Sequence, residues 1–162
     1  MRTLLALTVF GGGVAQATLA PALRVGDVAP DLPLIVVVLL ALRRGPEFGC
    51  LAGFAAGLLQ DTTGGGLIGV QALTKAMVGF AIGALGSRLR VTQPLVQVPG
   101  LALLTVVEGL ARFALLKLFH FPVPFSELMV YVVIPQAVYN GFLGAALVVG
   151  LACAESYRRQ AL

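Results

Sequence analysis

The chain has 162 residues, of which 59% are apolar and only 11% are charged. A soluble domain of this length needs roughly 25% charged residues to cover its surface, so this composition excludes an ordinary water-soluble protein. The formal net charge of +4 does not indicate nucleic-acid binding, because the basic residues lie at the ends of long apolar runs. We therefore expect an all-helical integral membrane protein, with residues 1–162 forming a single transmembrane domain.

The first apolar segment is nearly uncharged and covers residues 4–23, enough to cross about 30 Å of hydrocarbon at about 1.5 Å per residue. A cleaved signal peptide is the alternative, because Arg2 precedes the segment and Ala15-Gln16-Ala17 resembles a cleavage site. The apolar run continues past that site to Leu23, which favours a retained span.

The second and third apolar segments, at about 32–42 and 48–59, are short. Both segments are predicted to cross the membrane, with Arg43 and Arg44 reaching its surface between them. A re-entrant hairpin is the alternative, but it would bury both arginines in the membrane at a cost of about 3 kcal/mol each.

Three longer segments follow, at about 67–85, 95–119 and 128–154, which brings the predicted number of spans to six. Pro135 is expected to kink the last of them. The turns between these segments carry glycine, proline or charged residues, as expected where helices leave the membrane.

Basic residues cluster at alternate turns of this predicted bundle. If the N-terminus is cytoplasmic, the inner side receives Arg2, Arg43, Arg44, Arg88, Arg90, Arg158 and Arg159. The outer side keeps Arg24, Lys117 and most of the acidic residues. This pattern follows the positive-inside rule and predicts that both termini are cytoplasmic.

Glycines recur every four residues in two of the segments. Gly49, Gly53 and Gly57 share one face of the third span, and Gly79 and Gly83 share one face of the fourth. Small residues at this spacing let helix backbones approach closely in lipid. We expect these glycines to pack helices within the chain, while a contact with another protein's helix remains the alternative.

Several polar residues fall inside the predicted spans, where an ionisable group is costly and is often functional. Glu108 and Arg112 are four residues apart and are expected to form an ion pair on one helix face. Lys75 and Asn140 have no partner that spacing identifies; Lys75 either pairs with Glu108 or extends toward the outer surface. A structural pair is favoured, and a substrate or proton site is the alternative.

The residue types needed for catalysis do not occur in a recognisable arrangement. His120 and Ser126 share a turn without a third supporting group, and no metal-ligand or phosphate-binding motif occurs. Cys50 and Cys153 lie far apart in apolar runs and are interpreted as small buried hydrophobic residues. The sequence therefore predicts no enzyme activity, no metal and no cofactor.

Two regions resemble the family of the bacterial rod shape-determining protein MreD. The first has Pro30-Asp31, an apolar run, Arg43-Arg44-Gly45, and then a glycine-rich segment that leads to Gly69-Val70-Gln71-Ala72-Leu73 and on to Arg88-Leu89-Arg90. The second is the segment from Pro135 to Asn140 in the last span. The first and fifth spans match this family in hydropathy alone.

This resemblance implies a non-enzymatic subunit of the cell-elongation machinery in the bacterial cytoplasmic membrane. It implies binding to the single-span protein MreC, within a wider complex that contains the synthase RodA, its transpeptidase and MreB, and thereby support of peptidoglycan synthesis. It also implies the six-helix fold of the substrate-binding components of vitamin importers. A solute-binding importer component is therefore the alternative function, with a cavity near Lys75, Glu108 and Arg112.

Overall fold

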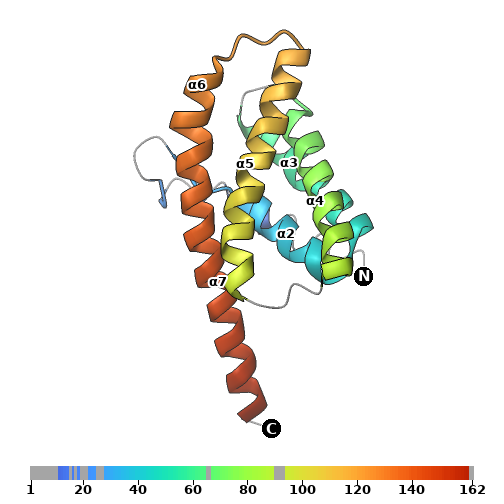
Figure 1. Cartoon of the computed structure of the whole chain (residues 1–162), viewed down its shortest axis with the longest axis vertical. Helices are drawn as coiled ribbons and strands as arrows, with labels where there is room; N and C mark the ends of the chain where they lie inside the picture. Colours follow the sequence, from blue (N-terminus) through green and yellow to red (C-terminus); the bar gives the residue numbers. More distant parts are fainter. Residues whose placement is uncertain are drawn as a thin grey trace.

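The protein is an elongated bundle of helices in a computed structural model (Figure 1). The structure describes residues 11–14, 16, 18, 22–24, 28–64, 67–89 and 94–160, and for residues 87–89, 94–98, 147–148 and 151–160 it describes the backbone only. Most of the first predicted span lies outside these residues, although residues 11–14, 16 and 18 are helical.

The helices follow the predicted apolar segments with shifted ends. Their bounds are α2 Leu32–Arg44, α3 Pro46–Gly64, α4 Val70–Leu89, α5 Pro94–Leu118, α6 Phe125–Glu127, η1 Leu128–Val133 and α7 Ile134–Gln160. The last three form one continuous helix (Figure 1). The third predicted span is longer than the apolar pattern indicated, because the polar residues from Gln60 to Gly64 continue the helix.

Two antiparallel helix pairs build the bundle. Helix α3 packs on α4, and α5 packs on α7, while α2 contacts both members of the first pair and reaches the second (Figure 1). Helix α2 has 13 residues, about 20 Å of rise, and it begins about half-way along the bundle. The preceding residues 28–31 are not helical, so this part of the chain enters the core as extended backbone.

A π-helical turn, η1, lies directly before Ile134 and Pro135, at the place where the sequence predicted a kink. Proline has no N–H and its ring collides with the carbonyl group four residues earlier, so a wider turn directly before Ile134–Pro135 accommodates it. Val133 of this turn fills the space left by Gly109 of α5, where an added Cβ would lie 2.5 Å from Val133 Cγ2.

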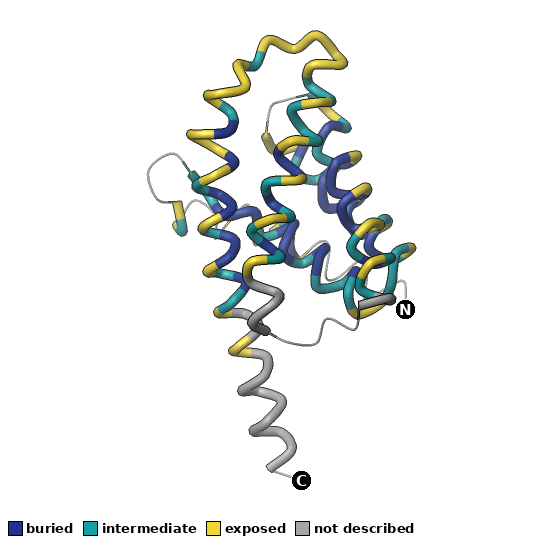
Figure 2. Tube along the Cα trace, in the orientation of Figure 1, coloured by how far each residue is buried: buried dark blue, intermediate teal, exposed yellow. Residues whose placement is uncertain are grey.

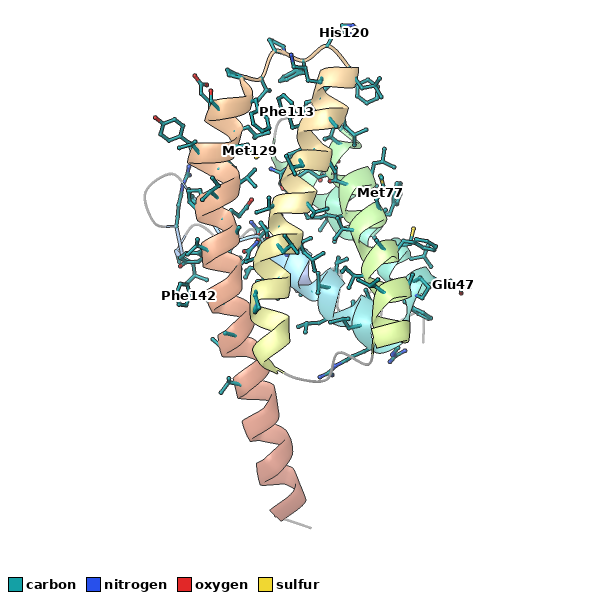
Figure 3. The ribbon with its side chains drawn as sticks, in the orientation of Figure 1. Glu47, Met77, Phe113, His120, Met129 and Phe142 are labelled. Carbon is teal, nitrogen blue, oxygen red and sulfur yellow. The ribbon has the colours of Figure 1, made fainter. Side chains whose placement is uncertain are left out.

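Burial divides the bundle into a small polar interior and an apolar exterior. Buried residues face the centre, and exposed residues follow the outer faces of the helices (Figure 2). Met77 and Phe142 point away from the bundle (Figure 3) and are 56% and 75% exposed. Large exposed apolar side chains on most outer faces are expected for helices solvated by lipid.

Among the described residues, one helical stretch is long and apolar enough to cross a membrane by length and composition, Phe125–Ala146. Val70–Gly86 is a shorter apolar helix of the same kind.

Candidate functional site

Lys75 is the centre of a group of buried polar side chains in the bundle interior. Its side chain is fully buried, and Nζ lies 2.8 Å from Asp31 Oδ2 and 3.4 Å from Glu108 Oε1. Nζ also donates a hydrogen bond of 2.8 Å to Gln71 Oε1, one helical turn earlier. Lys75 therefore pairs with Glu108, one of the two possibilities that the sequence left open, and its shortest ion pair is with Asp31, which lies between the first and second predicted spans.

Asp31 uses its two carboxylate oxygens for different purposes. Oδ1 accepts a hydrogen bond of 3.0 Å from the backbone N–H of Leu34 and so caps the N-terminus of α2. Oδ2 faces Lys75. The positive end of the α2 dipole and the ammonium group both stabilise this buried carboxylate.

Glu108 connects α4 to α5. Its Oε1 accepts a hydrogen bond of 3.1 Å from Thr74 Oγ1, and Arg112 Nη2 lies 3.1 Å from Oε1 and 2.8 Å from Oε2. The ion pair expected from the i, i+4 spacing is therefore present. Arg112 is on the edge of the group, with 14% of its side chain exposed.

Asn140 joins α7 to the same group. Its Oδ1 accepts a hydrogen bond of 2.9 Å from the backbone N–H of Asp31, and its Nδ2 donates one of 3.2 Å to Thr105 Oγ1 on α5. The Asn140 side chain is fully buried. Its partner is 109 residues away in the chain, so no local sequence pattern could have identified it.

The extended backbone before α2 is held by side chains on both sides. Backbone polar groups at membrane depth require partners inside the protein. Gln16 Nε2 donates to Pro30 O at 3.1 Å and its Oε1 accepts from Leu32 N at 3.0 Å, while Gln136 Nε2 of α7 donates to Ala29 O at 3.1 Å. Further upstream, Tyr139 Oη donates to Leu23 O at 2.8 Å.

We call Asp31, Lys75, Glu108 and Arg112 the buried charge cluster. It contains two acidic and two basic groups, so its formal charge is zero, and each ionic group contacts a group of opposite sign. The cluster contains no cysteine, serine or histidine that could act as a nucleophile or general base. In the part of the chain that the structure describes, no three His, Cys, Asp or Glu residues group as metal ligands.

The five glycines that the sequence singled out lie where α3 and α4 meet. A Cβ added at Gly49 would collide with the carbonyl oxygen of Gly79, and one added at Gly53 would collide with that of Lys75. A Cβ added at Gly57 would collide with the carbonyl oxygen of Gln71, and one added at Gly83 would collide with Cα of Pro46. We call this contact the glycine interface; it faces inward, between two helices of this chain.

Asp61 is a further polar residue, which lies directly after the third predicted span. It is buried near the end of α3 and accepts hydrogen bonds from three backbone N–H groups at the start of α4. These are Gly69 N to Oδ2 at 2.7 Å, Gln71 N to Oδ1 at 3.2 Å and Ala72 N to Oδ2 at 3.2 Å. A capping residue eight or more positions before its helix has no recognisable spacing, so sequence patterns miss it.

The topology-setting arginines are described only in part. Arg43 and Arg44 are exposed at the C-terminal end of α2, and the Arg44 guanidinium lies 5.9 Å from the centre of the Phe48 ring. Arg88 is in the last turn of α4 and Arg158 and Arg159 are in the last turns of α7, with side chains outside the described part. Arg90 lies outside the described residues.

Comparison with protein families finds one match that covers most of the chain. The family model described as rod shape-determining protein MreD matches residues 1–152. Comparison with curated proteins and with solved structures finds no significant match.

Proposed function

The chain belongs to the MreD family, membrane proteins that take part in rod-shape determination, and on this premise we propose that it is a non-enzymatic scaffold of the cell-elongation machinery. It binds the single-span protein MreC in the cytoplasmic membrane. Through this complex it supports peptidoglycan synthesis by RodA and its transpeptidase, with MreB in the wider assembly. Its contribution is to present a rigid helical surface rather than to transform a substrate.

The neutral, internally paired buried charge cluster is the observation that supports a scaffold most directly. A charged solute that entered this site would have to displace an ion pair that is already formed in a low-dielectric interior, which is costly. Here Lys75 already has two carboxylates, and the N-terminus of α2 already holds the carboxylate of Asp31. The cluster joins residues 28–31, α4 and α5, and Asn140 adds α7, so its role is to fix these segments relative to one another.

The proposed membrane arrangement has six spans and both termini in the cytoplasm. It is supported by the arginines at the ends of α2, α4 and α7, and by the length of α3, whose 19 residues rise about 28 Å, close to the hydrocarbon thickness. A re-entrant hairpin of α2 and α3 fits less well, because α3 is long enough to cross by itself and Arg43 and Arg44 are exposed.

Reporter fusions test this arrangement. A cytoplasmic reporter fused after Arg44 or after Arg90 should be active, and a periplasmic reporter at the same positions should be silent. The opposite result at either position would exclude the six-span arrangement.

Co-purification tests the proposed partner. The full-length chain and full-length MreC from the same genome are expressed together, extracted in mild detergent and isolated through a tag on MreC. We expect the chain to be retained, and a tagged single-span protein of unrelated function serves as the control. Equal recovery with both baits, or none with MreC, would contradict the proposal.

A solute-binding importer component is the second function to be tested. The extended backbone before α2 resembles the interrupted helices on which transporters build binding sites. Thermal stability of the purified chain is measured with a panel of vitamins. A stabilisation that saturates with concentration would favour this function; no shift with any vitamin supports the scaffold.

A further inference from the structure

The connection between α2 and α3 carries exposed cations at one end of the bundle. We call residues 43–47 the arginine turn; Arg43 and Arg44 end α2, both are exposed, and Pro46 begins α3. The Arg44 guanidinium lies 5.9 Å from the centre of the Phe48 ring, a distance at which a cation is attracted to the face of the ring. This contact holds one guanidinium at the surface of the turn.

The backbone of the arginine turn lies deeper in the bundle than the neighbouring ends of α4 and α5. Pro46 packs against Gly83, and α4 continues six residues beyond Gly83, about 9 Å. From the contact between Thr74 and Glu108, the distance along each helix is about 22 Å to the end of α4 and about 21 Å to the start of α5. These two helix ends therefore lie at nearly the same level (Figure 1).

This depth places the arginine turn at the edge of the hydrocarbon layer. The 25 residues of α5 rise about 37 Å, whereas the hydrocarbon layer is about 30 Å thick, so a centred bilayer leaves about 4 Å of α5 beyond it at each end. The turn lies about 9 Å from that end of the helices and so begins about 5 Å inside the hydrocarbon. An arginine there must extend its side chain to the headgroups and meet a group of opposite charge.

The described part of the chain supplies no such group. Among the described residues, no carboxylate lies within ion-pair distance of Arg44; Glu47 is exposed and points away from the bundle (Figure 3). The C-terminus of α2 and the N-terminus of α3 meet here, and their dipoles, roughly half a charge each and opposite in sign, cancel. Arg43, Arg44 and Glu47 leave a formal charge of +1, and Arg88 in the last turn of α4 adds to it.

An apolar track runs along α3 from the arginine turn toward the middle of the bundle. Leu51, Phe54 and Leu58 are 60%, 50% and 38% exposed, and their spacing of three and four residues places them on one face of the helix. The glycines that contact α4 lie on another face of α3, so this track faces outward. A headgroup at the turn would have its acyl chain alongside these residues.

We propose that the arginine turn binds the phosphate of an anionic phospholipid, with Arg44 as its direct ligand and Arg43 and Arg88 as further positive charge. A guanidinium donates paired hydrogen bonds to phosphate oxygens, and basic residues between membrane helices are typical sites for anionic headgroups. The depth of the turn and the apolar track below it favour a lipid over a soluble phosphate. The inference goes beyond the proposed function and does not depend on MreC.

Fluorescence quenching tests the site, because the chain contains no tryptophan and a single introduced one reports on its surroundings. Full-length chains with Phe48→Trp are reconstituted in phosphatidylcholine vesicles that contain increasing fractions of phosphatidylglycerol with brominated acyl chains, which quench an adjacent indole. We expect this position to prefer phosphatidylglycerol over phosphatidylcholine by at least about fivefold, the factor that one basic residue near the surface contributes. Phe142→Trp, on an exposed face of α7, is the control and should show a preference below about twofold.

A charge substitution identifies the ligand. Arg44→Gln added to Phe48→Trp should lower the preference about fivefold, whereas Lys117→Gln, which removes an exposed charge at the other end of α5, should leave it unchanged. Equal affinity for the two lipids, or a preference that survives Arg44→Gln, would overturn the proposal. So would relief of quenching by inorganic phosphate at matched ionic strength, because the turn would then bind a soluble anion.

Native mass spectrometry of the unsubstituted chain in detergent keeps the proposal testable if Phe48→Trp does not fold. The unsubstituted chain should retain phosphatidylglycerol in preference to phosphatidylcholine, and Arg44→Gln should retain less of it. Equal retention by the two chains would overturn the proposal. Neither measurement includes a partner protein, so failure of MreC to co-purify would exclude the proposed function and leave this inference in place.

Discussion

The glycine interface and the buried charge cluster hold neighbouring helices together by opposite means. At the glycine interface, α3 and α4 approach so closely that no side chain fits between their backbones, and dispersion between backbone atoms supplies the attraction. At the cluster, ionic groups too costly to leave alone in lipid stabilise one another. Lys75 belongs to both, because its carbonyl oxygen faces Gly53 and its ammonium group faces Asp31 and Glu108.

This comparison shows how a chain with few charged residues obtains both proximity and specificity. Close backbone contact brings two helices together but tolerates sliding along the helix axes. A charge with one correct partner on each neighbouring segment fixes a single register. Because Lys75 takes part in both contacts, the position of α3 against α4 and the position of α4 against α5 are determined together.

The largest expected effect comes from removing the central cation. Lys75→Met leaves Asp31 without its ion-pair partner in the bundle interior, and breaking a buried pair costs about 3–5 kcal/mol. The free energy of unfolding of the full-length chain in bicelles should fall by that amount. Lys117→Met, which changes an exposed lysine, is the control and should change it by less than about 0.5 kcal/mol.

The double variant sharpens this prediction. Adding Asp31→Asn to Lys75→Met removes the uncompensated negative charge and should restore part of the loss. Equal unfolding free energies for Lys75→Met and Lys117→Met would show that the cluster contributes nothing to stability.

A single methyl group at the glycine interface is expected to have the next largest effect. In Gly53→Ala the new Cβ collides with the carbonyl oxygen of Lys75, and backbone atoms cannot move aside, so we expect a loss of about 1–3 kcal/mol. Gly100→Ala is the control, because a Cβ there meets no atom within 4 Å. Thermal unfolding in nanodiscs that does not distinguish the two variants would refute the close contact.

This geometry also limits what larger substitutions can reveal. Leucine at Gly53 or Gly57 would push α3 away from α4, so loss of a partner in such a variant would report a disrupted fold. Tests of partner binding therefore belong at exposed positions on the outer faces of the helices.

Removal of the uncharged Asn140 side chain should lower the free energy of unfolding by less than removal of the Lys75 charge. Asn140→Ala leaves the backbone N–H of Asp31 and the hydroxyl of Thr105 without this partner, at an expected cost of about 1–2 kcal/mol. A double-mutant cycle with Thr105→Val measures the part that belongs to the Asn140–Thr105 hydrogen bond. If the losses of unfolding free energy in the two single variants simply add in the double variant, this hydrogen bond contributes nothing to stability.

The smallest expected effect is at Thr74, a buried neutral partner of the cluster. Thr74→Val keeps the shape of the side chain and removes the hydrogen bond to Glu108 Oε1. Hydrogen bonds between membrane helices contribute about 0.6 kcal/mol on average, and Glu108 keeps Lys75 and Arg112. A loss above about 2 kcal/mol in the same assay would show that Thr74 matters more than its neighbours suggest.

Features that depend on spacing along one helix could be predicted from the sequence. Glu108 and Arg112 are neighbours because four residues make about one turn, and the structure has that ion pair. Glycines four residues apart share a helix face for the same reason, although the sequence left open which helix they meet. The helical class and the approximate positions of the described helices followed from apolar length alone.

Features that depend on distant segments required the tertiary structure. Asp31 lies between the first two predicted spans and was expected on the outer side of the membrane, yet it is buried against Lys75, 44 positions later in the sequence. Asp61 and Asn140 likewise have partners that no periodicity identifies. The sequence by itself determined which residues lie on which helix faces, since helix geometry is local. Only the packing of those faces decided which charges meet, because a buried charge pairs with whatever the fold brings within reach.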